Sequence, residues 1–238
     1  MSSLRASRVV EDYLARIWKN EEWGDTTTTA GLASSVGVTP STVSATLKKL
    51  ARDGHIDYAP YGSVTLTDAG RRIAVQVVRR HRILEAYLVD ALGLGWHEVH
   101  QEADALEHAV SEAVLERMMD VLGQPDRDPH GDPIPDSSGR VEAPRPRRLS
   151  ILGVGESGVV DRVSDRQPEL LPYLHDRGLV RGTRVEVVWR SDATGLLGVR
   201  RVVALPVADP ALAAVEVAGG APYDIPLAVA TAVGVCQP

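Results

Sequence analysis

Residues 21–54, EEWGDTTTTAGLASSVGVTPSTVSATLKKLARDG, decide the fold of the N-terminal part of this chain. They predict a short helix over about Thr29–Val36, a tight turn, and a second helix from Pro40 to about Asp53. Gly37 suits the end of the first helix, and Thr39 suits the N-cap of the second, with proline at its first helical position. The pattern predicts a helix-turn-helix.

The segments on either side extend this motif. Two β-prone runs, residues 55–59 (HIDYA) and 63–67 (SVTLT), flank a turn at 60–62 (PYG). A β-hairpin directly after a helix-turn-helix is the plan of a winged helix. On the other side, residues 4–20 repeat apolar side chains at helical spacing and predict an amphipathic helix.

Three more helices are expected after the wing. Thr67 caps a long helix over residues 68–92, and shorter helices follow over about Trp96–Ala109 and Ser111–Leu122. Residues 123–148 are rich in Pro, Asp, Gly and Arg and show no periodicity. They are predicted to be a linker or an extended surface segment.

The C-terminal part has a different pattern. Short Val-rich runs alternate with turn residues after Leu149, which predicts a small β-barrel interrupted by one helical piece at 168–178. The expected strands are residues 157–163, 183–190, 198–205, 213–218 and 228–235.

Composition narrows the class of protein. The chain has 238 residues, enough for two domains, and its 44% hydrophobic and 24% charged residues are ordinary for a soluble globular protein. No apolar run approaches the ~18 residues of a membrane span, and the N-terminus has no apolar signal core. Cys236 is the only cysteine, so no internal disulfide is possible. We expect a cytoplasmic protein without a membrane partner.

The charge distribution leaves room for nucleic acid. The net charge of −6 argues against it overall, but DNA binding needs only a local basic patch. Hydroxyl side chains at the start of the second helix can reach phosphates or base edges, and the basic residues after them can contact phosphate. The candidate DNA contacts are Thr39, Pro40, Ser41, Thr42, Ser44, Lys48, Lys49 and Arg52. A second basic cluster is Arg71, Arg72, Arg79, Arg80 and Arg82. Winged helices also bind proteins, so the motif alone leaves both partners open.

A second stretch, residues 100–111 (HQEADALEHAVS), gathers acids and histidines with no cation among them. On one helix, His100, Asp104, Glu107 and His108 would share a stripe. Two like charges roughly 4 Å apart repel by about 4 kcal/mol at an effective dielectric constant of about 20, and a divalent cation removes that cost. The alternative is a solvated charged face.

Two earlier segments offer further metal donors. His81 and Glu85 lie four residues apart on the predicted long helix, and Asp12 lies on the first helix. A surface ion pair is the alternative for His81 and Glu85. Taken with the acidic stripe beside a winged helix, the pattern favours a metal-binding protein.

The order of these motifs resembles the diphtheria-toxin-repressor family of metal-dependent transcriptional repressors. The winged helix is followed by residues 79–88 (RRHRILEAYL), 99–112 (VHQEADALEHAVSE) and 131–135 (GDPIP). The resemblance covers about residues 4–140, and the tail resembles the SH3-like, FeoA-type domain of longer family members.

The resemblance implies a fold class and a division of the chain. It implies a mainly α N-terminal part, with a winged helix-turn-helix and a helical dimerisation domain, followed by a small all-β SH3-like barrel. The expected boundaries are 1–73 for the DNA-binding domain, 74–140 for the metal-binding and dimerisation domain, 141–150 for a linker and 151–238 for the barrel.

The resemblance also implies two metal sites per subunit. Asp12, Asp104, Glu107 and His108 would form one site. His81, Glu85 and His100 would form the other, with Asp165 and Gln167 as candidate donors from the C-terminal domain.

Family function implies a homodimer that represses metal-homeostasis genes from double-stranded, palindromic operator DNA. The dimer interface would use apolar side chains after the wing, and core packing is an equal alternative for them. These side chains are Val114, Leu115, Met118, Met119 and Leu122.

Ligand chemistry favours manganese over iron. Iron-sensing members of the family have a methionine where Asp12 stands and a cysteine where Asp104 stands, and softer donors of that kind suit softer metals. Carboxylates with a histidine suit Mn²⁺, so Mn²⁺ is predicted as the corepressor, with Fe²⁺ as the competitor. One departure is Ala15, which stands where short manganese-type members carry a glutamate.

Other functions have less support in the sequence. A metalloenzyme would show a motif such as HExxH, a nucleophile elbow or a Gly-rich phosphate loop, and none is present. Residues 153–158 (GVGESG) predict a β-turn, and His175 predicts a surface histidine. A metal-free regulator bound to a small effector would need a large apolar pocket that no motif indicates. The prediction is therefore that the protein is not an enzyme.

Overall fold

The computed structural model describes residues 7–59, 62–141, 145–205 and 215–237. They form two compact units, 1–129 with 133–145, and 130–132 with 146–238. Parts of several predictions lie outside the described residues. These are residues 4–6 of the first helix, Pro60 and Tyr61 of the wing turn, 142–144 of the linker, and 213–214 of one strand.

The first unit begins with the predicted helix-turn-helix. Helices α2 (Thr29–Val36) and α3 (Pro40–Arg52) lie where they were predicted, whereas α1 (Arg8–Glu22) begins after Ser7 and runs two residues beyond the predicted end at residue 20. The Thr39 side chain accepts a hydrogen bond from the backbone N–H of Thr42, and Gly37 ends α2 with a φ of 72°. One apolar core joins the three helices, because Leu14, Ile17, Leu32, Leu47 and Leu50 are all buried in it.

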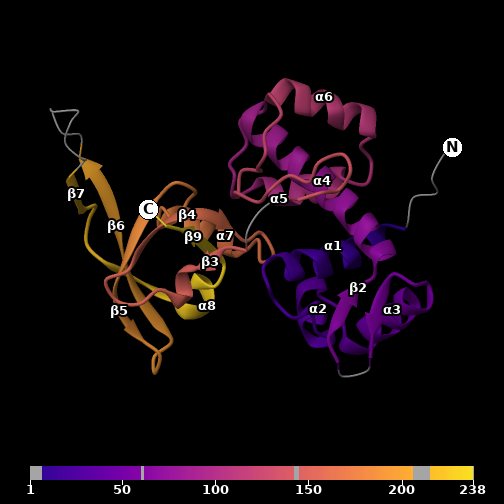
Figure 1. The fold of residues 1–238 in the computed structure, drawn as a ribbon, viewed down its shortest axis with the longest axis horizontal. Coiled ribbons are helices and arrows are strands. Elements are labelled where there is room, and N and C mark those ends of the chain that lie inside the picture. Colours follow the sequence, from indigo (N-terminus) through magenta and orange to yellow (C-terminus); the bar gives the residue numbers. More distant parts are fainter. Residues whose placement is uncertain (1–6, 60–61, 142–144, 206–214, 238) are drawn as a thin grey trace. The chain divides into compact units, whose positions relative to one another are not determined.

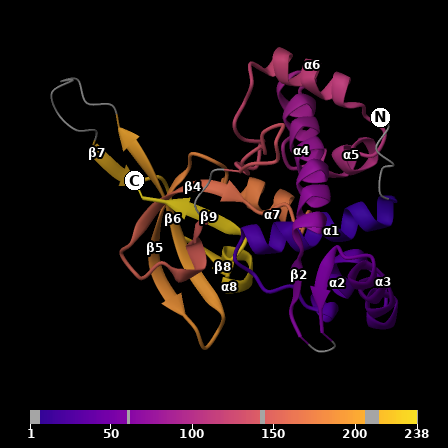
Figure 2. The same cartoon turned by 45° about the vertical axis from the view of Figure 1, so that its right-hand side comes forward.

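The wing and the long helix follow as predicted. Strands β1 (Ile56–Tyr58) and β2 (Val64–Leu66) pair antiparallel, and Thr67 caps α4 (Asp68–Asp90). In both Figure 1 and Figure 2, α4 extends from α1 towards the remaining helices of this unit. Gly70 lies so close to the carbonyl of His55 that a Cβ there would clash with backbone. The wing is thereby held against the start of α4.

Of the two helices after α4, one lies where it was predicted and the other is shorter than predicted. Helix α6 (Glu112–Leu122) matches, but α5 is Val99–Leu106 and not Trp96–Ala109. It ends early because the chain tightens into a turn, where the N–H of Ala109 donates to the carbonyl of Leu106. The acids and histidines of this region therefore lie on α5 and on the turn that follows it.

The apolar residues of α6 divide between two roles. Leu115 and Met119 are buried with Ile83, Leu84 and other residues of α4 and α5, so they are core residues of their own chain. Val114 is 45% exposed and does not belong to that core.

The Pro-rich segment after α6 is not the linker or surface segment that was predicted. Residues 130–133 and 135 are buried, as is Asp128, so this stretch is neither a linker nor a surface segment there. Arginines of α4 explain the difference. Arg79 donates to the carbonyl of Pro135 (2.9 Å), and Arg82 donates to that of Pro133 (2.6 Å). These hydrogen bonds bury the segment through its backbone carbonyls. Its sequence therefore has no periodic pattern of apolar residues that would have indicated burial.

The second basic cluster is also corrected. Arg79, Arg80 and Arg82 are buried and paired with acids, so they cannot form a DNA-facing patch. Arg82 pairs with Glu22 at 2.6 Å and also lies over the ring of Trp18. These arginines tie helices together, because a buried cation needs an opposite charge.

The second unit is built on one antiparallel sheet. Its strands are β3 (Arg147–Arg148), β4 (Ser157–Val163), β5 (Arg184–Ser191), β6 (Leu196–Leu205), β7 (Val215–Ala218), β8 (Tyr223–Pro226) and β9 (Val233–Cys236). The pairing order is β3-β9-β4-β5-β6-β7, and β8 also pairs with β6. This confirms that the C-terminal part is built on antiparallel β-strands. Within the described ranges the pairing path is open, so closure into a barrel stays a prediction.

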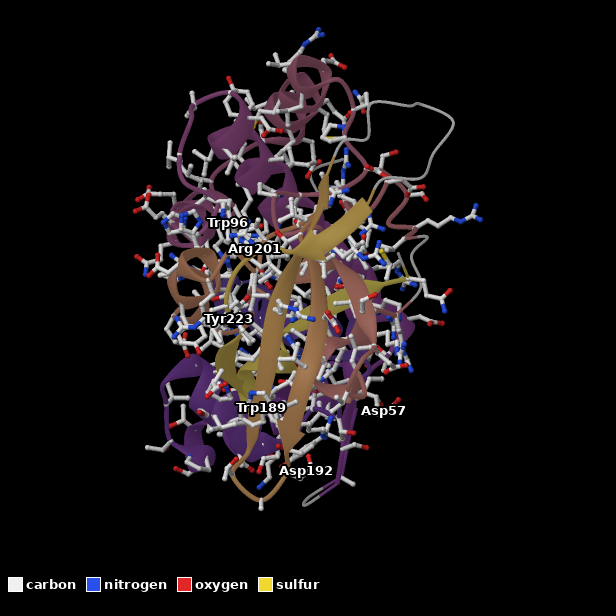
Figure 3. All side chains as sticks on the ribbon, turned by 90° about the vertical axis from the view of Figure 1, so that its left-hand side faces the viewer. Asp57, Trp96, Trp189, Asp192, Arg201 and Tyr223 are labelled. Carbon is white, nitrogen blue, oxygen red and sulfur yellow. The ribbon has the colours of Figure 1, made fainter. Side chains whose placement is uncertain are left out.

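Short helices complete the second unit: η1 (Leu149–Ile151), α7 (Leu170–Asp176) and α8 (Leu227–Ala230). Helix α7 is the predicted helical piece. Figure 3 labels Trp189, which comes from β5. Its indole ring lies beside Gly198 of β6, where only a glycine leaves room for it. The predicted turn at 153–158 is present, because the N–H of Glu156 donates to the carbonyl of Gly153.

In the part of the chain that the structure describes, every helix is too short or too polar to span a bilayer.

Candidate metal centre

The first turns of α1 bring two acids to the end of α5. Glu11 is buried on the apolar face of the helix, whereas Asp12 is half-buried beside it. The turn after α5 presents Glu107 and His108 to the same place. Helix periodicity explains why Glu11 is buried, because it shares a face of α1 with Leu14 and other buried residues.

Three of the predicted ligands meet there. Nε2 of His108 lies 2.9 Å from Oδ1 of Asp12 and 3.2 Å from Oε1 of Glu107. One donor atom from each of these residues fits within 4.8 Å of the others, as a shared metal ion requires. Two carboxylates and an imidazole nitrogen in one pocket form a donor set that suits a divalent cation.

The electrostatics of the two carboxyls differ. Burial raises the pKa of Asp12, and the neighbouring Glu107 raises it further, against the opposing effect of His108 and Arg8. Burial also acts to raise the pKa of Glu107, but the hydrogen bond and charge of His81 outweigh it, with help from Lys19 and His108. The pKa of Glu107 therefore lies below its ordinary value.

The second predicted cluster also comes together in the first unit. His81 and Glu85 lie one turn apart on α4, and Nε2 of His81 is 2.9 Å from Oε1 of Glu85. Nδ1 of His100, on α5, is 3.1 Å from both groups. All three side chains are buried or nearly so.

Asp104 lies between the two clusters. Its Oδ1 is 3.3 Å from Nδ1 of His81, and its Oδ2 is 3.6 Å from Nε2 of His100. Asp104, His81 and Glu107 form a further group of donor atoms within 4.8 Å of one another. Asp104 was predicted to share a site with Asp12 and His108, whereas in the structure it contacts the two histidines of the second cluster.

The two candidates in the C-terminal part belong to the second unit. Asp165 is buried and Gln167 is exposed, and both lie in the turn between β4 and α7. Their role as ligands of a site in the first unit stays a prediction. His175 is exposed on α7, as expected for a surface histidine.

The helix α3 presents the candidate DNA contacts. Ser41, Thr42, Lys48, Lys49 and Arg52 are exposed, while the opposite face of the helix is buried in the core. The remaining candidates differ in exposure and in the hydrogen bonds that they already make. Thr39 and Pro40 are exposed at the helix start, where the Thr39 hydroxyl is engaged in capping. Ser44 is half-buried, with its Oγ 3.4 Å from the hydroxyl of Tyr58 on the wing.

Sequence reasoning missed two residues at the metal cluster, Glu11 and Arg80. Oε2 of Glu11 lies 2.8 Å from Nδ1 of His108 and 3.1 Å from Nη2 of Arg80. The sequence signal that could have found them is a charged residue within the apolar stripe of a helix. Glu11 shares the buried face of α1, and Arg80 that of α4.

Family models match three parts of the chain. Residues 6–64 match "Iron dependent repressor, N-terminal DNA binding domain", and residues 67–136 match "Iron dependent repressor, metal binding and dimerisation domain". Residues 147–205 match the FeoA domain.

Curated relatives point the same way. The chain is 38% identical over 192 residues to the iron-dependent repressor IdeR of Mycobacterium tuberculosis, covering 74% of this chain and 82% of that protein. It is 34% identical over 196 residues to the diphtheria toxin repressor of Corynebacterium diphtheriae, covering 76% and 84%.

Solved structures resemble nearly the whole chain. One described as a manganese-dependent transcriptional repressor in complex with manganese is 40% identical, with a TM-score of 0.80, and covers 96% of this chain and all of its own. The manganese regulator SloR is 25% identical, with a TM-score of 0.78 and coverage of 96% and 98%.

Proposed function

Because the chain belongs to the iron-dependent repressor family of metal-dependent, DNA-binding transcriptional repressors, we propose that Mn²⁺ is its corepressor. The observation that carries this is the cluster of Asp12, Glu107 and His108, with donor atoms within 4.8 Å of one another. Every donor in it is a carboxylate oxygen or an imidazole nitrogen, and no soft sulfur takes part. Such sites suit Mn²⁺ better than sulfur-containing ones do.

Asp12, Glu107 and His108 would hold the ion at the first site. When bound, the ion would supply a divalent charge that offsets the repulsion between the two carboxylates. His81, Glu85 and His100 would form a second site, with Asp104 close to both. The likeness to the manganese-bound repressor supports the choice of manganese, and the likeness to IdeR keeps Fe²⁺ as the alternative.

Asp12 and Glu107 lie in different parts of the first unit. Asp12 is on α1, whose apolar face packs in the core of the helix-turn-helix. Glu107 follows α5, in the region matched by the dimerisation model. Drawing the two carboxylates together therefore fixes the DNA-reading helix relative to the dimerisation helices, and the fixed arrangement is the one that binds DNA.

We further propose that the protein acts as a homodimer on palindromic operator DNA. Two copies of α3 would enter successive major grooves about 34 Å apart. Exposed apolar side chains on α6 support a partner surface, and Val114 and Val121 are the most exposed of them, at 45% and 68%. The exposed Lys48 and Lys49 of α3 would contact phosphate.

The division of the chain proposed from its sequence completes this assignment. Residues 1–73 would read DNA, 74–140 would bind metal and pair subunits, 141–150 would connect, and 151–238 would form an SH3-like domain. The FeoA match supports the last assignment. In this proposal the chain has no enzymatic activity and works in the cytoplasm, where the operator is.

The experiment is a mobility shift with DNA selected by the protein itself. Duplexes are first enriched from a random pool with manganese-loaded protein. Binding is then compared across Mn²⁺, Fe²⁺, Zn²⁺ and Mg²⁺ under anaerobic conditions. The proposal expects Mn²⁺ to support the shift at concentrations where Mg²⁺ does not. If Fe²⁺ supports it at concentrations where Mn²⁺ fails, the manganese assignment is wrong.

A further inference from the structure

A buried carboxylate lies behind the histidine of the Asp12 cluster. Glu11 is 4% exposed, and its Oε2 is 2.8 Å from Nδ1 of His108. The other ring nitrogen, Nε2, faces the carboxylates of Asp12 and Glu107 at 2.9 and 3.2 Å. The two edges of the imidazole therefore have different surroundings.

Arg80 holds Glu11 in place. Its Nη2 donates to Oε2 of Glu11 at 3.1 Å, and its Nε donates to the backbone carbonyl of Glu107 at 3.0 Å. Both charged side chains are only 5% exposed, so each neutralises the other where water does not reach. Arg80 thus connects Glu11 to the backbone of the turn that carries Glu107 and His108.

We propose that Glu11 is a positioning residue for the metal site, an inference that rests on the function proposed above. A neutral imidazole carries one N–H and one free lone pair. Glu11 accepts the Nδ1–H of His108, so the lone pair of Nε2 points towards Asp12 and Glu107. A carboxylate on the far nitrogen fixes the ring orientation and makes the near nitrogen a better ligand.

The chain offers a matched control for the charge of Glu11. Glu112 also faces Arg80, with its Oε1 4.0 Å from Nη1, but from a side chain that is 58% exposed. Replacing Glu112 changes the acidic surroundings of the same guanidinium and leaves the Glu11–His108 hydrogen bond in place. Loss of charge near Arg80 is thereby separated from loss of the acceptor on His108.

The experiment compares the full-length wild type with Glu11→Ala, Glu11→Gln, Glu112→Gln and Asp12→Ala. Mn²⁺ affinity is measured by competition with a fluorescent chelator. The ring nitrogens and the Nδ1–H proton of His108 are followed by NMR in the protein loaded with diamagnetic Zn²⁺.

The expected result separates the variants. Glu11→Ala weakens Mn²⁺ binding roughly 10- to 100-fold, as loss of an outer-shell partner does. It also exposes the Nδ1–H of His108 to exchange with solvent. Glu11→Gln keeps an oxygen acceptor, so it shows a smaller loss and a shifted Nδ1–H signal. Glu112→Gln behaves as the wild type.

Three results would overturn the inference. One is wild-type Mn²⁺ affinity in Glu11→Ala, and another is weakened affinity with an unchanged His108 ring signal. If Glu11→Ala does not fold, Glu11→Gln decides, and wild-type affinity with an unshifted Nδ1–H is the third. Wild-type affinity in Asp12→Ala would instead contradict the proposed metal site itself.

Discussion

Oε2 of Glu107 lies 2.8 Å from Nδ1 of His81, and both side chains are buried. The other oxygen of Glu107 is 3.2 Å from Nε2 of His108. One carboxylate therefore contacts a histidine of each candidate metal cluster. Movement of Glu107 would therefore disturb both candidate clusters.

Glu107→Gln should abolish tight metal binding while leaving the fold intact. The amide has the shape of the carboxylate but carries no charge, and it presents only one oxygen. We expect Mn²⁺ affinity to fall by more than the roughly 10- to 100-fold typical of outer-shell partners. Calorimetric titration measures the affinity, and far-UV circular dichroism checks the helices. Wild-type affinity in this variant would remove Glu107 from the site.

Metal binding should weaken as the pH falls into the acid range. Burial raises the pKa of Asp12 above its usual 3.8, so its proton must be displaced by the metal at higher pH than for an exposed aspartate. In the metal-free protein the same raised pKa makes the folded state less stable as pH rises from 3.8 through the folded value.

Titration in buffers of different ionisation enthalpy counts the protons that Mn²⁺ releases. Asp12→Asn should release fewer protons than the wild type in the acid range. Equal proton release from the two proteins would contradict the assignment of Asp12 as a ligand.

Lys49→Ala should weaken DNA binding about equally for all sequences. Lys49 is exposed on α3 and is expected to contact phosphate, so its loss should lower the salt slope of the binding constant by about 1. Arg181→Ala is the control, because Arg181 is an exposed surface residue of the second unit, outside the proposed DNA and dimer surfaces. Fluorescence anisotropy at several salt concentrations gives the slope. An unchanged slope for Lys49→Ala would place Lys49 outside the DNA interface.

Arg82→Met should destabilise the first unit by about 3–5 kcal/mol, because it leaves buried acids without their cation. Arg82 pairs with Glu22 and lies 3.6 Å from Asp128, with a side chain 1% exposed. Arg72→Met, at an exposed position of the same helix, should change stability by no more than about 0.5 kcal/mol. Urea unfolding measures both, and equal midpoints would show that the buried ion pairs do not stabilise the fold.

The sequence predicted those elements whose causes are local. Thr39, Gly37 and Thr67 mark helix ends through their own hydrogen bonds or backbone angles, so their positions were predictable. The end of α5 was not, because no glycine or proline marks it and the acidic stripe continues at helical spacing.

The candidate site was predictable in its residue types but not in its pairings. Spacing along a helix shows that His81 and Glu85 share a face, but not which carboxylate of another segment approaches them. Asp104 illustrates this, because its oxygens lie nearest His81 and His100. The place of Glu11 at the site could not be predicted without its buried partner Arg80, which lies 69 residues away in the chain.

An anomalous-difference map from crystals grown with Mn²⁺ tests the central claim most directly. We expect a peak within bonding distance of Asp12, Glu107 and His108, where the ion would join α1 to the turn after α5. A map with its manganese peaks elsewhere and Asp12 turned towards solvent would contradict it.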